Sequence, residues 1–273
     1  MKTITTTADD FGLTESVNAA VERAYREGCL HAASLMVAAP AAEDAIRIAK
    51  ANPGLRVGLH LVVIEGASMQ PPFKIPGLVD AAGQFPSDQL KLGVNYFFRP
   101  GIRRQLESEI QAQFEAFAKT GLILDHVNAH KHMYLHPTVG SITLRTGKNY
   151  GMKRIRVPAE PSRVMQACGE TIGLGAKTLS VWTNLLRHQA KAAGIIANDH
   201  CFGLTWTGHM TPVRIRRLLD HLPDADNEIY FHPATARDTT LTRLMPTYEH
   251  EAELATLLDP DIIAEVSKYR HLS

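Results

Sequence analysis

The chain has 273 residues, of which 45% are hydrophobic and 21% charged, proportions typical of one soluble globular unit. They exclude a disordered, collagen-like or disulfide-stapled chain. The 29 basic and 28 acidic residues give a net charge of +1, so no strong positive field favours nucleic acid as a partner.

The beginning of the sequence and its cysteines indicate a compartment. The first residues, MKTITTTADDFG, contain no apolar segment like that of a secretory signal, and the longest apolar run, Ala32–Ala42, is too short to span a bilayer. Cys29, Cys168 and Cys201 show no CxxC spacing, which favours buried thiols in a reducing compartment. We therefore expect a cytoplasmic protein, with peripheral contact to the inner membrane as an alternative.

Short β-rich segments alternate with helical patterns along the chain. The predicted strands are Lys2–Ala8, Ala33–Ala38, Arg56–Val63, Leu124–Ala129, Arg154–Val157, Asp199–Leu204 and Glu228–His232. This alternation predicts an α/β fold with a parallel sheet, either a barrel of about seven or eight βα units or an open doubly wound sheet. We favour a (β/α) barrel-like fold, an incomplete or distorted relative of the TIM barrel.

Two helices and one long connection stand out between these strands. The first helix begins after Thr14, a good N-cap, and ends at Gly28, and another spans Arg103–Lys119. Residues 64–100 contain five prolines and are too long for an ordinary βα connection, so we expect them to cover a site. Without a repeat or a linker, the sequence predicts a single domain over residues 1–273 with this insertion.

Acids and histidines follow several predicted strands directly, where α/β folds gather catalytic groups. The common GxSxG, HExxH, GxGxxG and GxxxxGK[ST] motifs are absent. Asp9 and Asp10 come after the first strand, and because adjacent carboxylates repel each other, a cation bound by one would leave the other free as a base. A solvated turn is the plainer interpretation of this pair.

Histidines supply the other candidates. His60 lies in a predicted buried strand, where a lone histidine is more often a hydrogen-bonded core residue. The segment DHVNAHKHMYLHP holds four histidines, of which we expect His130 or His132 to be a ligand and the other to support it. His232 ends an apolar strand and precedes a proline. Together the strand-end residues predict a functional site.

Five motifs resemble the YdjC/ChbG family of carbohydrate deacetylases, which is related to the NodB-type polysaccharide deacetylases. They are ADDFGL at 8–13, GLHL at 58–61, NAHKH at 128–132, RVPAE at 156–160 and FHP at 231–233. The segments HMYLHP at 132–137 and FGLTW at 202–206 are similar to the hopanoid-biosynthesis-associated HpnK branch. The resemblance implies removal of the N-acetyl group from an N-acetylglucosamine-type sugar carried on a hopanoid lipid, giving the glucosaminyl form.

The resemblance also implies roles for single residues. One divalent ion would be bound by three ligands, namely Asp10, His60 and His130. Asp9 would be the general base, His232 the general acid, and Arg156 the residue that orients the base. Two imidazoles and a carboxylate suit zinc, with magnesium as the alternative from the family.

The chain departs from the family's DSHxHxH motif at three positions, where it has Asn128, Ala129 and Tyr134. The roles of His132, Tyr134 and His136 therefore stay open. Other functions also stay open: a deacetylase of soluble N-acetylated oligosaccharides, another metal-dependent hydrolase such as a phosphoesterase, or a sugar- or lipid-binding protein without catalysis.

Two segments mix apolar with basic residues in a way that suits an anionic membrane surface, Leu90–Arg104 and Thr178–Ile196. The plainer interpretations are a covering loop for the first and a core helix for the second. The oligomeric state stays open, with a homodimer as one alternative.

Overall fold

The structure, a computed structural model, describes residues 2–270, and of residues 174, 176 and 177 only the backbone. In this part of the chain eight strands form one sheet in the order β6-β5-β4-β3-β2-β1-β8-β7, and every neighbouring pair is parallel. The strands are β1 (Thr3–Phe11), β2 (Ala32–Leu35), β3 (Arg56–Leu61), β4 (Val127–Ala129), β5 (Arg154–Ile155), β6 (Ile196–Ala197), β7 (His200–Phe202) and β8 (Asp226–Phe231). The sheet curls into a partial barrel, which confirms the predicted fold class.

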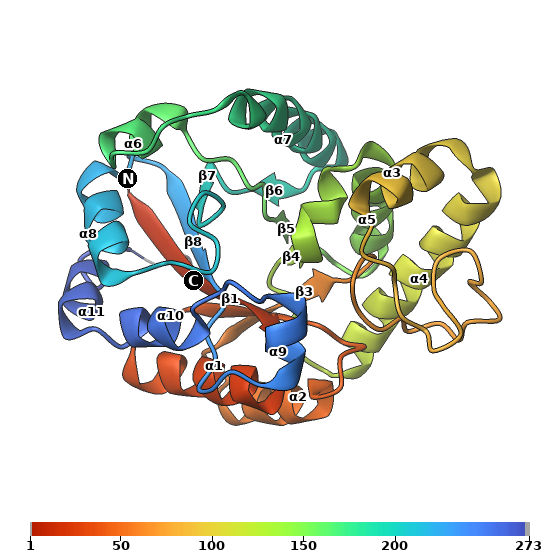
Figure 1. Cartoon of the computed structure of the whole chain (residues 1–273), viewed down its shortest axis with the longest axis horizontal. Helices are drawn as coiled ribbons and strands as arrows, with labels where there is room; N and C mark the ends of the chain where they lie inside the picture. The colour runs from red at the N-terminus through yellow and green to blue at the C-terminus, as the bar shows by residue number, and fades with distance from the viewer. Residues whose placement is uncertain (1, 271–273) are drawn as a thin grey trace.

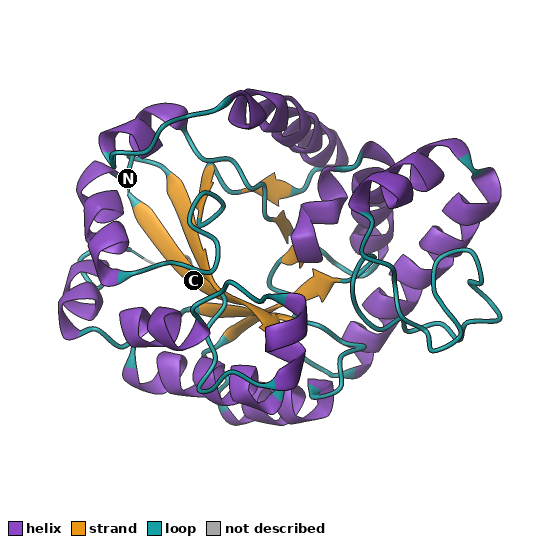
Figure 2. Cartoon of the chain, viewed as in Figure 1, coloured by secondary structure: helices purple, strands orange, loops and turns teal. Residues whose placement is uncertain are grey.

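Helices surround the strands on the outside of the barrel (Figures 1 and 2). They are α1 (Glu15–Glu27), α2 (Ala42–Ala51), α3 (Gln89–Phe98), α4 (Pro100–Lys119), α5 (Pro137–Asn149), α6 (Ser162–Ala167), α7 (Leu174–Ala193), α8 (Pro212–His221), α9 (Thr239–Leu244), α10 (His250–Leu257) and α11 (Pro260–Val266), with a 3₁₀ helix η1 (His130–Leu135). None of the described helices is long and apolar enough to cross a bilayer.

The first helix forms as its sequence predicts. The Thr14 hydroxyl accepts a hydrogen bond from the Val17 amide at 3.3 Å, which satisfies one of the free N–H groups of the first turn. Helix α1 ends before Gly28, where a side chain would collide with the backbone of Leu257. All three cysteines are buried free thiols, as expected.

The barrel is not closed by a strand pair. Strands β6 and β7 are the two edges of the sheet, although only Asn198 and Asp199 separate them in the chain. Asn198, in the connection between them, binds the chain that follows β5: its Oδ1 accepts from the Val157 amide at 2.6 Å and its Nδ2 donates to the Val157 carbonyl at 2.9 Å. A side-chain amide thus continues the contact between β5 and β6 beyond the ends of both strands.

The insertion is more ordered than the sequence predicts. Residues 89–98 form helix α3 and only Arg99 separates it from α4, so the interpretation of Leu90–Arg104 as a loop is wrong. The sequence of α3 shows no clear helical pattern, because the helix is short and one of its exposed faces is apolar. Buried Glu109 of α4 anchors the preceding coil, since its carboxylate accepts from the Met69 and Gln70 amides at 2.8 Å each.

Candidate active site

The carboxyl ends of four strands bring distant residues into one place. Asp9 and Asp10 lie in β1, His60 in β3, His130 directly after β4, and His232 directly after β8. Because parallel strands end at the same edge of the sheet, side chains far apart in sequence meet there. Asp9, Asp10, His60 and His130 are buried and His232 is half-buried, and the structure brings these residues of the sequence prediction together.

Asp9 and Asp10 face the same region although they are neighbours in a strand. In a regular strand adjacent side chains point to opposite faces. Here the pairing of β1 with β2 shifts register between Ala8 and Phe11, and Asp10 has a positive φ of 61°. This bulge turns both carboxylates toward the strand ends.

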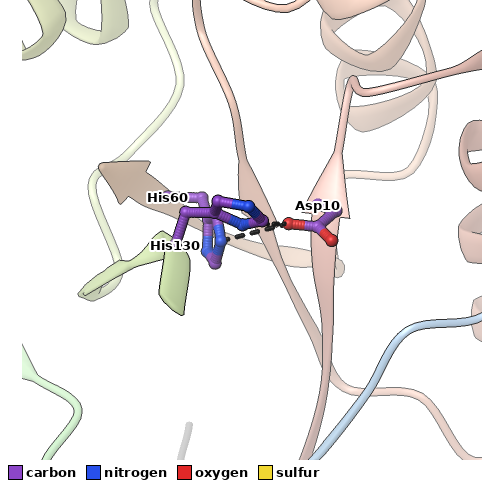
Figure 3. A group of neighbouring side chains, drawn as sticks. All are labelled: Asp10, His60 and His130. Carbon is purple, nitrogen blue, oxygen red and sulfur yellow. Dashed lines mark hydrogen bonds and ion pairs between the residues drawn. The ribbon is translucent and has the colours of Figure 1, made fainter. Parts of the chain in front are cut away.

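Asp10, His60 and His130 form a cluster of three donors (Figure 3). Asp10 Oδ1 lies 3.2 Å from His60 Nε2 and 3.1 Å from His130 Nδ1, and one ligand atom from each residue lies within 4.8 Å of the others. Burial raises the pKa of Asp10, but the His130 and His60 imidazoles outweigh it and keep the pKa well below the usual value, so the carboxylate is charged.

The cluster fits a divalent ion. Asp10 Oδ2 and His130 Nε2 are buried without a hydrogen-bond partner, which is costly unless something else binds them. A carboxylate with two imidazoles is a ligand set for zinc and related ions. Among the described residues it is the one group of His, Cys, Asp and Glu that converges in this way.

Asn128 orients both the cluster and Asp9. Its Oδ1 lies 2.7 Å from His60 Nδ1, and because an amide oxygen can only accept, Nδ1 carries a proton and Nε2, which faces Asp10, is the ring nitrogen that would bind an ion. Asn128 Nδ2 donates to Asp9 Oδ1 at 3.0 Å and to Ser34 Oγ at 2.8 Å. The departure from the family motif at this position therefore still supplies an orienting group.

Arg156 forms an ion pair with Asp9. Its NH1 lies 2.5 Å from Asp9 Oδ2 and its NH2 lies 2.9 Å from Asp9 Oδ1, which is a bidentate pair. Glu228 accepts from the other side of the guanidinium at 2.8 and 3.0 Å. Burial raises the pKa of Asp9, but the Arg156 guanidinium lowers it by more. The pKa therefore lies below its usual value, and Asp9 is a carboxylate at any physiological pH.

His232 is surrounded by aromatic rings. Tyr230 and Tyr248 lie edge-on to its imidazole, with ring centroids 5.6 and 5.1 Å away. Burial lowers the pKa of His232 to about 4, so the free protein holds it neutral near pH 7. Its Nδ1 is buried without a hydrogen-bond partner.

The other histidines of the 126–136 segment do not join the cluster. His126 Nε2 lies 3.0 Å from Ser34 Oγ and extends the network behind Asn128. His132 Nε2 lies 3.2 Å from the Tyr230 hydroxyl, and burial lowers the pKa of His132 to about 3. His136 lies edge-on to Tyr96 instead.

These side chains enclose a cavity of about 270 Å³, here called the strand-end cavity. Its walls include Asp9, His60, His130, Tyr230 and His232. Two histidines of the ion-binding cluster, the Asp9 carboxylate and the His232 imidazole therefore line one small cavity.

The sequence interpretation missed Glu228, Tyr230 and Glu253. A signal for the first two exists, because residues 228, 230 and 232 alternate along β8 and share the face that carries His232. Glu253 comes from a helix distant in sequence, and no local pattern connects it to this site.

Comparisons with known proteins agree with this geometry. The family model described as YdjC-like protein matches residues 3–268. A carbohydrate deacetylase from Geobacillus stearothermophilus is 29% identical over 263 residues, which are 96% of this chain and 91% of the relative. One from Vibrio parahaemolyticus serotype O3:K6 is 30% identical over 267 residues, covering 96% of this chain and 90% of the relative.

A solved structure of a protein from Enterococcus faecalis V583 has the same fold. It superposes with a TM-score of 0.75 at 21% identity and covers 98% of this chain and 94% of its own. This similarity supports the architecture and carries no statement about substrate.

Proposed function

Because the chain belongs to the YdjC-like protein family, we propose that it is a metal-dependent carbohydrate deacetylase that hydrolyses the N-acetyl group of an amino sugar to a free amine and acetate. The observation that carries the proposal is the strand-end cavity, whose wall holds Asp9, two histidines of the ion-binding cluster and His232. Amide hydrolysis requires an activated water, a base and an acid, and this cavity provides a group for each.

Asp10, His60 and His130 would bind one divalent ion, with zinc favoured over magnesium by the two imidazoles. Such an ion polarises a carbonyl and lowers the pKa of water from 15.7 to about 7. Asn128 fixes the His60 ring in the tautomer that leaves its Nε2 lone pair available.

Asp9 is the general base. Arg156 donates to both oxygens of its carboxylate and Asn128 donates to Oδ1, which holds the carboxylate in one orientation. The pairing with Arg156 keeps Asp9 charged and makes its carboxylate a weak base. Asp9 would therefore hold the proton that it takes from the water only transiently. Arg156 is a positioning residue, and Glu228 fixes it in turn.

His232 is the general acid that protonates the leaving nitrogen. In the free protein the pKa of His232 is low. Negative charge that develops on the reacting acetyl group in the same cavity would raise this pKa, so His232 would be protonated as the leaving nitrogen requires a proton. General acid catalysis contributes about 10² to 10⁴ in rate, or roughly 3 to 5 kcal/mol.

The test is acetate release from N-acetylglucosamine oligosaccharides by purified protein, with phosphate release from an aryl phosphate as the comparison. We expect acetate release that is abolished by a chelator and restored by zinc, and no phosphate release. Phosphate release without acetate would refute the deacetylase and favour a phosphoesterase. Failure to release either product, with the ion bound, would indicate a binding protein.

The finer part of the proposal is a glycolipid substrate, an N-acetylglucosaminyl group on a hopanoid. It is supported by an apolar pocket of about 330 Å³ lined by Gly93, Met133, Leu135, Leu179 and Trp182. Lys131 and His132 line both this pocket and the strand-end cavity. An apolar group attached to the sugar would thus have a place beside the reacting amide.

Trp182→Ala tests the glycolipid substrate. The indole contributes much of the apolar wall, so its loss should lower kcat/KM for an N-acetylglucosaminyl hopanoid about 10-fold or more, and leave kcat/KM for a soluble oligosaccharide within about 2-fold. Equal losses on both substrates would refute a lipid pocket.

A membrane contact is the second part of the finer proposal. Leu90, Val94, Phe97 and Phe98 lie on one exposed face of α3, and Trp182 of α7 is 41% exposed beside the apolar pocket. Arg99, Arg103 and Lys91 adjoin this face and complement anionic lipid.

Sedimentation with phosphatidylglycerol vesicles tests the membrane contact. We expect the wild type to sediment with the vesicles and Phe98→Ser to sediment less. The matched control is Ile123→Ser, because Ile123 is 88% exposed but precedes β4 and lies at the opposite end of the barrel. Sedimentation that Ile123→Ser reduces as much as Phe98→Ser would show that the α3 face is not special.

A further inference from the structure

The backbone of His232 lies just beyond the sheet that carries it. The last pairs of β8 join Phe231 to Ala8 and Ile229 to Phe202. Pro233 follows His232 and has no N–H to donate. The ladder therefore does not fix the peptide groups on either side of His232.

Helix α10 supplies the missing contacts. Glu253 Oε2 accepts from the His232 amide at 2.5 Å, and His250 Nδ1 lies 2.7 Å from the His232 carbonyl. A carbonyl can only accept, so His250 is the donor and carries its proton on Nδ1. The His250 carbonyl also accepts from the Ala234 amide at 3.3 Å. One helix thus binds the chain before, at and after His232.

Glu253 also joins a second wall of the cavity to this helix. Its Oε1 accepts from the Met210 amide at 3.0 Å, and Met210 ends a segment whose Leu204 and Thr207 line the strand-end cavity. Glu253 is only 1% exposed, and burial raises the pKa of its carboxyl to about 7. A buried acid costs stability, which suggests that these two amide contacts serve a purpose.

We propose that Glu253 and His250 are positioning residues, which hold the peptide of His232 so that its imidazole faces the leaving nitrogen. This inference rests on the proposed function, in which His232 is the general acid. Neither residue lines the strand-end cavity, so both act through His232.

Glu253→Gln is the first test variant. Glutamine fills the same volume but has a single carbonyl oxygen, so it can accept from only one of the His232 and Met210 amides, and its NH₂ opposes the other. Displacing a catalytic group by about 1 Å can cost roughly 100-fold in rate. We expect kcat to fall about 10- to 100-fold while KM and bound metal stay unchanged. The matched control is Glu251→Gln, on the same helix but in contact with Arg237 instead.

His250 permits a conservative rescue. The amide nitrogen of asparagine occupies nearly the place of imidazole Nδ1, so His250→Asn keeps the donor, whereas His250→Leu removes it. We expect His250→Leu to lose kcat about 10-fold and His250→Asn to retain most of it. Equal losses in the two variants would mean that the hydrogen bond to His232 is not what matters.

The decisive measurement repeats both substitutions in a His232→Ala background. If Glu253 and His250 act through His232, Glu253→Gln and His250→Leu should cause no further loss of kcat once the imidazole is gone. The same fold-loss in both backgrounds would overturn the inference and assign the two residues a general structural role.

A readout without turnover separates this inference from the proposed function. In protein labelled with ¹⁵N-histidine, the ring resonances of His232 should shift or broaden in Glu253→Gln and His250→Leu and stay in place in His250→Asn and Glu251→Gln. Unchanged resonances in all four variants would refute the positioning. If they behave as expected but the wild type releases no acetate, the positioning holds and the deacetylase does not.

Discussion

Asp9 and Asp10 are adjacent residues with opposite electrostatic surroundings. Asp9 is paired with the Arg156 guanidinium, whereas Asp10 faces the His60 and His130 imidazoles and keeps one oxygen without a hydrogen-bond partner. The sequence predicted that these carboxylates divide the work of ligand and base. The bulge that lets both face one cavity has no sequence signature, since glycine is absent at the strained position.

The pair Asp10→Asn and Asp9→Asn tests this division of roles. Loss of the Asp10 charge should lower metal affinity about 100-fold or more, because the ion then has one anionic ligand fewer. Asp9→Asn should keep the metal and lower kcat by about 10² to 10⁴. Elemental analysis and acetate release measure both effects. Metal retained equally by the two variants would contradict the ligand assignment.

Neutral buried histidines predict sensitivity to acid. Burial lowers the pKa of His232 to about 4 and that of His132 to about 3, below the value of about 6.5 in an unfolded chain. The unfolded state therefore binds protons that the folded state does not, and stability falls as the pH drops below 6.5. Each histidine contributes up to about 2 kcal/mol between pH 6.5 and 5.

Urea unfolding of the metal-free protein at pH 7, 6 and 5 measures this dependence. The curve for His132→Asn should fall less steeply than that of the wild type as the pH drops, because one titrating ring is gone, whereas groups of opposite sign such as Glu253, whose pKa burial raises to about 7, are common to both proteins. The slope with pH is compared rather than the absolute stability, since the variant also loses the contact with Tyr230. An identical slope would show that His132 titrates normally in the folded protein.

At the scale of elements, the sequence predicted those strands and helices that hydrophobic periodicity and turn residues specify. All seven predicted strands are present, and the helices after Thr14 and up to Lys119 are confirmed. It missed α3, whose exposed apolar face gives little amphipathic contrast, and the two-residue strand Ile196–Ala197, which is too short to show alternation. Residues 196–197 form a strand because they pair with β5, and their own sequence does not indicate it.

A buried carboxylate is one of the groups that attach the insertion to helix α4. Glu109 accepts from the Met69 and Gln70 amides and from Gln113 Nε2, all at 2.8 Å. Glu109→Ala should leave the Met69 and Gln70 amides without this partner, while Gln113 Nε2 keeps the Val62 carbonyl, at a cost of about 1 to 3 kcal/mol in unfolding free energy, and should speed hydrogen exchange at residues 69 and 70. Glu109→Gln, with one acceptor left, should fall between.

The hydrogen-exchange experiment compares the insertion with α1 as an internal reference. Faster exchange confined to the insertion in Glu109→Ala supports local anchoring. Faster exchange of α1 as well would show that the variant loosens the whole protein, which would contradict an anchor that acts locally.

At the scale of the whole molecule, the incomplete closure of the barrel connects stability with the site. The connection between the edge strands β6 and β7 is fixed in place where Asn198 binds both backbone groups of Val157, and Arg156 is the residue immediately before Val157. The alternation of strands and helices in the sequence predicted a barrel-like fold, incomplete or distorted. It could not predict the contact between Asn198 and Val157, because an asparagine between two short strands resembles an ordinary turn residue.

Asn198→Ala should therefore affect both stability and activity. It leaves the buried N–H of Val157 without a partner and its C=O with the Ala159 amide alone, at a cost of about 1 to 3 kcal/mol measured by urea unfolding. Because Arg156 is displaced with Val157, kcat should also fall about 10-fold at temperatures where the variant is fully folded, while the cluster around Asp10 keeps its metal. Asn198→Asp, which retains only the acceptor, should be intermediate in stability. A variant that is destabilised but fully active would show that the seam supports the barrel without positioning Arg156.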